Sequence, residues 1–196
     1  SNIFNGALTF AQSRTYTFNS NSTQTLNGAF TANGTCASPM TISGGSGTGF
    51  TTFSKASGSV TINYVRLNNT YTGGAATFTA NNTTDFGNNA GWNLNLPSAQ
   101  TLYWVGGAGN WTDANRWASS SGGTGGACIP TIYDDVVFDV NSGFGPSTTI
   151  DGQAYCRNMT WTNGLGSPSL TGSSPLDIHG SLSLTAGMGL TYTGQI

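Results

Sequence analysis

The sequence predicts an all-β fold, a parallel β-solenoid whose short strands stack in successive coils. Only 6% of the 196 residues are charged and none is Glu, so the residues that normally solubilise helix surfaces are nearly absent. Apolar residues alternate with Thr, Ser or Asn over short segments bounded by Gly, Asn or Ser, which is typical of strands and turns. One segment also returns along the chain at a spacing typical of a solenoid coil.

The alternating segments follow one another through both halves of the chain. Each is a few residues long, and β-branched Thr fills many of the polar positions, where it suits a pleated surface. The expected strands are, in chain order, Ala7–Phe10, Thr15–Phe18, Thr25–Leu26, Ala29–Thr31, Val60–Val65, Ala76–Thr79, Ser147–Ile150, Asn158–Trp161, Leu182–Leu184 and Leu190–Tyr192.

The returning segment indicates how these strands are arranged. Phe4–Ala11 recurs as Leu26–Asn33, an offset of 22 residues, and a weaker echo occupies Ile178–Thr185. A single coil cannot bury its own apolar face, so coils of this length stack and bury their inward side chains in one continuous core. A β-sandwich of short antiparallel strands is the alternative, because it shows the same alternation.

A change in the residue pattern near Asn95–Gln100, from short alternating segments to a Trp- and Gly-rich segment, predicts a domain boundary. Residues 1–97 are expected to be the end of one solenoid segment, and residues 98–196 a Trp-rich cap followed by the start of a second. The segment Tyr103–Trp117 holds three of the five tryptophans, and a Gly-rich loop follows it.

The aromatic residues of the second half allow two interpretations. They can plug the open end of a solenoid core as a cap, or they can lie exposed and stack on sugar rings. The candidates are Tyr103, Trp104, Trp111, Trp117 and Trp161.

Three cysteines match no zinc-site spacing, and His179 is the single histidine. Cys128 and Cys156 flank one segment and are the candidate disulfide, with two buried free thiols as the alternative. Cys36 is then left over as a small core residue.

Several functions are disfavoured by what the sequence lacks. The formal net charge is −2 and the five basic residues are scattered, so no nucleic acid partner is expected. No apolar run reaches the roughly 20 residues that cross a bilayer, so membrane insertion is not expected. The chain opens within a strand-like pattern and is interpreted as a window from a longer polypeptide.

Catalytic, cofactor and metal sites are likewise not expected. Asp134, Asp135 and Asp139 invite a calcium site, but they lack the spacing of an EF-hand loop and are interpreted as solubilising residues at a strand edge. The seven Asp residues and the single His form no cluster of an acid with a base, so we expect no enzyme.

Two sets of short motifs add a resemblance to this picture. They are Tyr103–Gly107, Gly109–Trp111, Asn115–Trp117, Pro130, Asp134–Asp139 and Tyr155–Trp161, with Tyr16–Phe18, Gly34–Cys36, Phe53–Gly58 and Gly87–Trp92 in the first half. Together they resemble a repeat region of very large secreted cell-surface proteins of Bacteroidota, which are gliding-motility proteins or adhesins exported by the type IX pathway. The resemblance covers most of the chain and implies an extracellular location at the cell surface.

The leading hypothesis is therefore a non-catalytic structural and adhesive repeat of a long surface protein or filament, forming a stiff stalk. Its partners are expected to be neighbouring repeats of the same or identical chains, and surface polysaccharide. A carbohydrate-binding module with exposed Trp and Tyr is the alternative, and a β-helical polysaccharide lyase or hydrolase is the third hypothesis.

Overall fold

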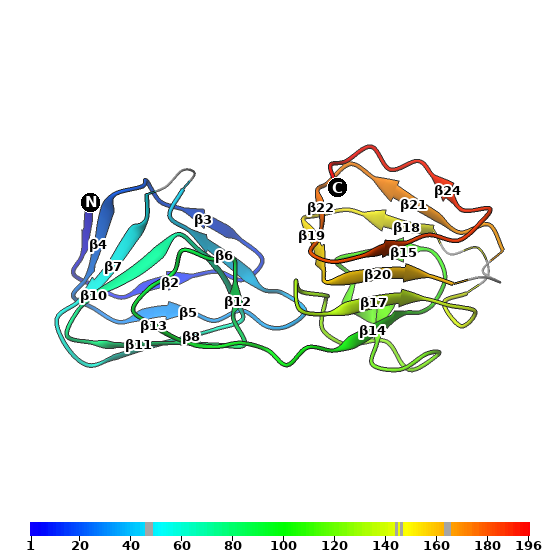
Figure 1. Cartoon of the computed structure of the whole chain (residues 1–196). Helices are drawn as coiled ribbons and strands as arrows, with labels where there is room; N and C mark the ends of the chain where they lie inside the picture. The colour runs from blue at the N-terminus through cyan, green and yellow to red at the C-terminus, as the bar shows by residue number, and fades with distance from the viewer. Residues whose placement is uncertain (46–48, 144, 146, 163–165) are drawn as a thin grey trace. The chain divides into compact units, whose positions relative to one another are not determined.

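The fold is a parallel β-solenoid of about eight turns, with 47% of residues in strands and 2% in helix. It is seen in a computed structural model that describes residues 1–45, 49–143, 145, 147–162 and 166–196 (Figure 1). Successive coils pair in parallel, so the antiparallel β-sandwich alternative is wrong. The chain divides into two compact units, Ser1–Pro97 (unit 1) and Ser98–Ile196 (unit 2).

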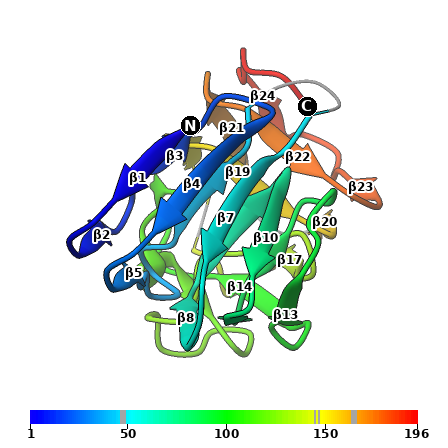
Figure 2. The same ribbon diagram turned by 90° about the vertical axis from the view of Figure 1, so that its left-hand side faces the viewer.

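Unit 1 winds through three faces in each coil. Its strands are β1 (Asn2–Phe4), β2 (Leu8–Phe10), β3 (Thr15–Thr17), β4 (Ser22–Leu26), β5 (Phe30–Ala32), β6 (Met40–Ser43), β7 (Thr51–Lys55), β8 (Ser59–Asn63), β9 (Val65–Asn68), β10 (Thr70–Gly74), β11 (Thr77–Asn81), β12 (Thr84–Asp85) and β13 (Trp92–Asn95). The first face orders as β1-β4-β7-β10, the second contains β2-β5 and β8-β11-β13, and the third orders as β3-β6-β9-β12. Figure 2 shows the strands of the first face side by side.

The register of unit 1 follows the repeat in the sequence. Phe4 pairs with Leu26 and Leu8 pairs with Phe30, which is the offset of 22 residues seen in the returning segment. Apolar residues therefore stack on apolar residues from coil to coil. Because successive side chains of a strand point to opposite faces, this register keeps the apolar residues inward. Some polar residues also point inward and are buried, among them Gln24, Thr51 and Thr70.

Corners of unit 1 are made by single residues in the left-handed region. Asn69 joins β9 to β10 at φ 54°, and Asn88 occupies the same conformation one coil later at φ 53°. Asn tolerates this region better than most residues because its short side chain forms local hydrogen bonds. The Asn88 amide donates to the Asn69 side chain over 2.8 Å, so the two corners are also tied to each other.

The core of unit 1 is one stack of inward residues taken from all three faces. Its buried members are Phe10, Leu26, Phe30, Ala32, Met40, Ile42, Phe53, Val60, Ile62, Val65, Leu67, Phe78, Ala80 and Trp92. The rings of Phe30 and Phe53 stack with their centroids 5.7 Å apart, which joins successive coils. The free energy of this burial is shared between neighbouring coils, as expected of a solenoid.

Unit 2 repeats this architecture after an altered first coil. Its elements are β14 (Thr101–Trp104), β15 (Gly109–Asn110), the 3-10 helix η1 (Ala114–Arg116), β16 (Trp117–Ala118), β17 (Asp135–Phe138), β18 (Ser147–Ile150), β19 (Ala154–Cys156), β20 (Asn158–Trp161), β21 (Ser169–Gly172), β22 (Leu176–Ile178), β23 (Leu182–Ser183) and β24 (Gly189–Leu190). The sheets order as β16-β14-β17-β20-β23, β15-β18-β21-β24 and β19-β22. A second core cluster, rich in Trp, fills the interior of this unit.

Candidate functional site

The Trp-rich segment closes the first coil of unit 2. β16 turns back and pairs antiparallel with β14, placing Trp117 opposite Trp104 and Ala118 opposite Tyr103. β16 therefore occupies the outer edge of β14, whereas β17 pairs in parallel on the inner side. A strand edge covered in this way presents fewer unpaired backbone groups to another chain.

The tryptophans of this segment pack edge to face. Trp117 meets Trp104 with ring centroids 5.1 Å apart and Trp111 with centroids 4.7 Å apart. Phe138 of the next coil stacks flat on Trp161 with centroids 3.7 Å apart. Offset and edge-to-face pairs of this kind stabilise beyond the area that they bury.

These contacts decide between the two interpretations of the aromatic residues. Trp104, Trp111, Trp117 and Trp161 are all buried, so the interpretation as exposed sugar-stacking rings is wrong for these four. Their flat faces are covered by one another and by the core, because large apolar rings gain most when removed from water. Tyr103, on the alternate face of β14, is half-buried.

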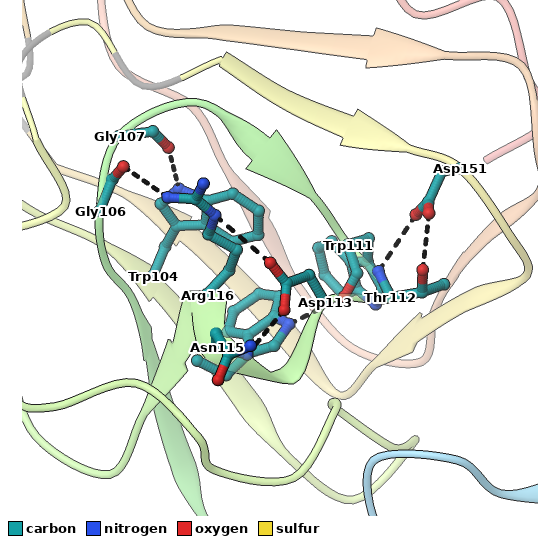
Figure 3. Close-up of polar contacts among 10 residues, drawn as sticks. Trp104, Gly106, Gly107, Trp111, Thr112, Asp113, Asn115, Arg116 and Asp151 are labelled. Carbon is teal, nitrogen blue, oxygen red and sulfur yellow. Dashed lines mark hydrogen bonds and ion pairs between the residues drawn. The ribbon is translucent and has the colours of Figure 1, made fainter.

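Two buried indole groups of the cap donate hydrogen bonds to backbone carbonyls, whereas Nε1 of buried Trp161 has no partner among the described atoms. Trp104 Nε1 donates to the Gly107 carbonyl over 2.6 Å (Figure 3). Trp117 Nε1 donates to the Trp111 carbonyl over 2.9 Å. A buried N–H without a partner costs about 1–3 kcal/mol, so these bonds make burial of the rings tolerable. They also fix how the loop after β14 runs.

A short polar network holds the loop of the cap together. Asp113 accepts from the Asn115 backbone N–H over 3.0 Å as the N-cap of η1, and Arg116 donates to the Gly106 carbonyl over 2.5 Å. Thr112 donates to the Asp151 carboxylate through its backbone N–H over 3.1 Å and through its hydroxyl over 2.6 Å. Figure 3 shows these groups around the tryptophans, and the loop is thus tied to a later coil.

The predicted disulfide between Cys128 and Cys156 is wrong. Among the described cysteines, Cys156 is free, and it lies buried on the inward side of β19. Burial raises the pKa of its thiol to about 12, and Asp135 and Asp134 add to this by electrostatic repulsion of a thiolate. Cys128 and Cys36 are disulfide-bonded instead, so Cys36 is not a spare core residue.

The acidic residues considered for calcium are engaged by protein donors. Asp134 is buried and accepts from the backbone N–H of Gln100 over 3.0 Å and of Thr131 over 2.8 Å. Asp135 accepts two hydrogen bonds from Arg157, at 2.8 and 2.5 Å. Among the described residues, no group of three or more His, Cys or acidic side chains is placed to hold a metal ion.

Asp135 lies in a tie between coils on the outside of unit 2. Arg157 and Asn158 both donate to its carboxylate, the latter over 2.7 Å, and the Asn158 side chain then accepts from the Ser181 backbone N–H over 2.8 Å. The Arg157 hydrogen bonds hold the pKa of Asp135 below its ordinary value, against the opposing effect of burial. One acidic residue thus links three successive coils.

Unit 1 contains a ladder of hydrogen-bonded Asn side chains that was not predicted from the sequence. Asn63 donates to Asn33 over 2.7 Å, Asn81 donates to Asn63 over 3.2 Å, and Asn95 donates to Asn81 over 2.7 Å. Each of these residues directly follows an inward apolar residue at or just after a strand end. That recurrence after Ala32, Ile62, Ala80 and Leu94 is the signal that would have revealed it.

Comparisons of the chain with protein-family models, with curated proteins and with solved structures gave no match. Within the described part of the chain, no helix is long and apolar enough to cross a membrane.

Proposed function

We propose that this chain is a non-catalytic structural and adhesive repeat of a long extracellular surface protein, in which stacked coils form a stiff stalk. The observation that carries the proposal is the parallel register of successive coils within each unit, in which inward residues stack on inward residues. In such a stack each coil is held by its two neighbours, so stiffness along the stack follows from the fold.

The side chains outside the core support the same role. The Asn ladder and the Asp135–Arg157–Asn158 tie join coils to each other, and the carboxylates of the cap bind neighbouring backbone groups. The carboxylate, guanidinium and amide side chains named here thus hold coils together. The outer surface left for adhesion is rich in Thr, Ser and Asn, which suits polar partners such as a surface polysaccharide.

The extracellular location is part of the proposal. Disulfide-bonded Cys36 and Cys128 suit an oxidising compartment, since disulfides persist mainly in secreted and cell-surface proteins. The resemblance to repeat regions of large Bacteroidota surface proteins adds export by the type IX pathway and a part in adhesion or gliding. Neighbouring repeats of the same or identical chains are the expected partners.

The experiment that tests this role is immunogold electron microscopy of intact producing cells, with an antibody raised against the folded chain. We expect gold particles along thin fibres at the cell surface, and fewer attached cells when the same antibody is added as Fab fragments. Fab fragments against an unrelated surface protein are the control. Label confined to compact particles in the medium, with normal attachment, contradicts the proposal.

A further inference from the structure

The first face of unit 1 carries a column of buried hydroxyl side chains in a core that is otherwise mostly apolar. Ser22, Thr51 and Thr70 are the first residues of β4, β7 and β10, and all three are buried. Ser22 pairs with Thr51 and Thr51 pairs with Thr70, so the three residues follow one another through three coils. We call these three residues the hydroxyl column.

Hydrogen bonds inside the core hold the hydroxyl column. Ser22 Oγ and Thr51 Oγ1 lie 3.2 Å apart, and they donate to the carbonyl of Asn19 over 2.5 and 2.9 Å. Thr70 Oγ1 donates to the side chain of Asn89 over 2.7 Å. A buried hydroxyl without a partner is costly, so the column is stable only while the strands keep an alignment that supplies these partners.

The connections that lead into these three strands do not set their alignment. They comprise residues 18–21 before β4, residues 44–50 before β7 and only residue 69 before β10. Although the connections differ so much in length, each strand begins at a residue of the hydroxyl column. Connection length therefore leaves open which residue of one coil pairs with which residue of the next.

The alternation of inward and outward side chains narrows the choice of register but does not decide it. A slip of one residue would turn the inward side chains of a strand outward, so the core forbids it. A slip of two residues keeps every side chain on its own side of the sheet. Registers that differ by two residues therefore remain in competition.

Between β4 and β7, the apolar residues favour a register that is not the observed one. The observed pairing places buried Gln24 beside buried Phe53. A slip of two residues would instead pair Leu26 with Phe53 and Gln24 with Thr51, and we call this alternative the slipped register. It would bring two large apolar side chains into contact, and the burial of such contacts stabilises a solenoid core.

The slipped register would break the hydroxyl column between its first two members. It moves β4 by about 6.6 Å along its own axis, and Ser22 would then lie beside Gly49, which offers no hydroxyl. Thr51 would lose both the Ser22 hydroxyl and the Asn19 carbonyl, which belongs to the connection ahead of β4. The slipped register thus gains an apolar contact but loses buried hydrogen bonds, which are costly to leave unmade.

We propose that the hydroxyl column selects the register of the first face of unit 1, against the slipped register that the apolar residues favour. Its hydroxyls find their partners only when the strands are aligned as observed. A single buried polar residue fixes the register of coiled-coil helices for the same reason. The inference concerns how the coils of this chain align, and it is independent of what the chain binds.

Disulfide trapping on the outward side of the face reads the register directly. Thr25 pairs with Ser54 in the observed register and would lie opposite Thr52 in the slipped one. Paired positions on neighbouring strands lie about 4.8 Å apart, which a disulfide spans, whereas diagonal positions lie about 7–8 Å apart, which it does not. Thr25→Cys with Ser54→Cys therefore reports the observed register, and Thr25→Cys with Thr52→Cys reports the slipped one.

The first experiment compares the two reporters in the full chain in a glutathione redox buffer, with the cross-links identified by mass spectrometry. With the column intact, the reporter for the observed register should cross-link about 10-fold more than the other. In the background Ser22→Ala with Thr51→Val, this ratio should fall about 10-fold, because the slipped register gains population. An unchanged ratio in this background, with the circular dichroism spectrum of the wild type, overturns the proposal.

Two matched backgrounds separate the hydroxyl column from a general loosening of the strands. Ser22→Thr with Thr51→Ser exchanges the two side chains but keeps both hydroxyls, so it should keep the wild-type ratio. Thr23→Val removes a hydroxyl from the outward side of β4 and should also leave the ratio unchanged. A comparable fall in either background contradicts the proposal, because the effect would then not depend on the buried hydroxyls.

A milder variant decides the question if the double substitution prevents folding. Thr51→Val alone nearly keeps the shape of the side chain and leaves the bond from Ser22 to the Asn19 carbonyl in place. The chain should then fold, and the ratio of the two reporters should fall about 3-fold, because only part of the column is lost. A wild-type ratio in this folded variant shows that the column does not select the register.

Discussion

The first coils of the two units differ in whether another described strand pairs with their outer edge. In unit 2, β16 pairs with the edge of β14 and three tryptophans fill the space beneath it. Among the described residues of unit 1, β1, β2 and β3 are the outermost strands of their sheets, and the rings of Phe10 and Tyr16 stack with their centroids 3.9 Å apart. The pairing of β14 with β16 is the only antiparallel pair of named strands among the described residues.

The cap of unit 2 is thus formed by the residues that follow β14 and lead back to it as β16. The antiparallel return of β16 requires the connection over residues 105–116, which contains β15 and η1. The Thr112–Asp151 and Arg116–Gly106 contacts hold this connection in place. Without such a return, the same parallel geometry leaves donors and acceptors free to pair with another strand. The following predictions test the comparison, from the largest expected effect to the smallest.

Trp117→Ala should have the largest effect, because it opens a cavity in the middle of the cap. We expect a loss of about 4 kcal/mol in the free energy of unfolding of unit 2, typical of a large buried aromatic side chain. Hydrogen exchange should show faster exchange in β14 and β17. Tyr16→Ala, in the first coil of unit 1, is the control. It should lower the free energy of unfolding by about half as much, since Tyr16 is already half-buried. Equal losses would contradict a special role for the cap.

Asn63→Ala should destabilise unit 1 by about 1–2 kcal/mol, because it breaks two rungs of the ladder at once. Asn95→Ala removes a single rung at the end of the ladder and should cost less than half of that. Hydrogen exchange in β8 and β11, followed over a urea series, measures both. If the terminal substitution costs as much as the interior one, the ladder is not a shared element of stability.

Asp135→Asn should reduce the stability of unit 2 by about 1 kcal/mol or less, as is usual for exposed ion pairs. Arg157 lowers the pKa of Asp135 in the folded chain. The contribution is therefore fully present above the ordinary pKa of Asp and is lost as the pH falls through the folded-state pKa. Denaturation midpoints measured from neutral to acidic pH should fall more steeply for the wild type than for the variant. Arg157→Gln should flatten the curve equally, and a steeper curve for either variant would contradict the assignment.

The smallest effect is expected at Cys156, whose thiol is buried with a pKa raised to about 12. Iodoacetamide should leave the folded chain unmodified, because the thiolate is the reactive form. After unfolding without reductant, mass spectrometry should find one alkylated cysteine per chain, and with reductant all three. Rapid labelling of Cys156 in the folded chain would contradict its burial.

The fold itself was largely predictable from local patterns. The recurrence of Phe4–Ala11 as Leu26–Asn33 predicts the register of strand pairing, because stacked coils pair residues one repeat apart. The near absence of charged helix-solubilising residues predicted an all-β chain for the same local reason, but it left the β-sandwich open as an alternative. The change of texture near Asn95–Gln100 falls at the division between the two units.

The sequence by itself thus determined the all-β class, the 22-residue step between the first coils and many of the strands, which depend on periodicity and turn chemistry within a few residues. Strands such as β6, β7 and β10 were not predicted. The tertiary structure alone decided which cysteine stays free, which faces of the tryptophans are covered, and where Asp135 finds Arg157. These outcomes depend on distances between residues that lie far apart along the chain, set by how each coil turns its corners.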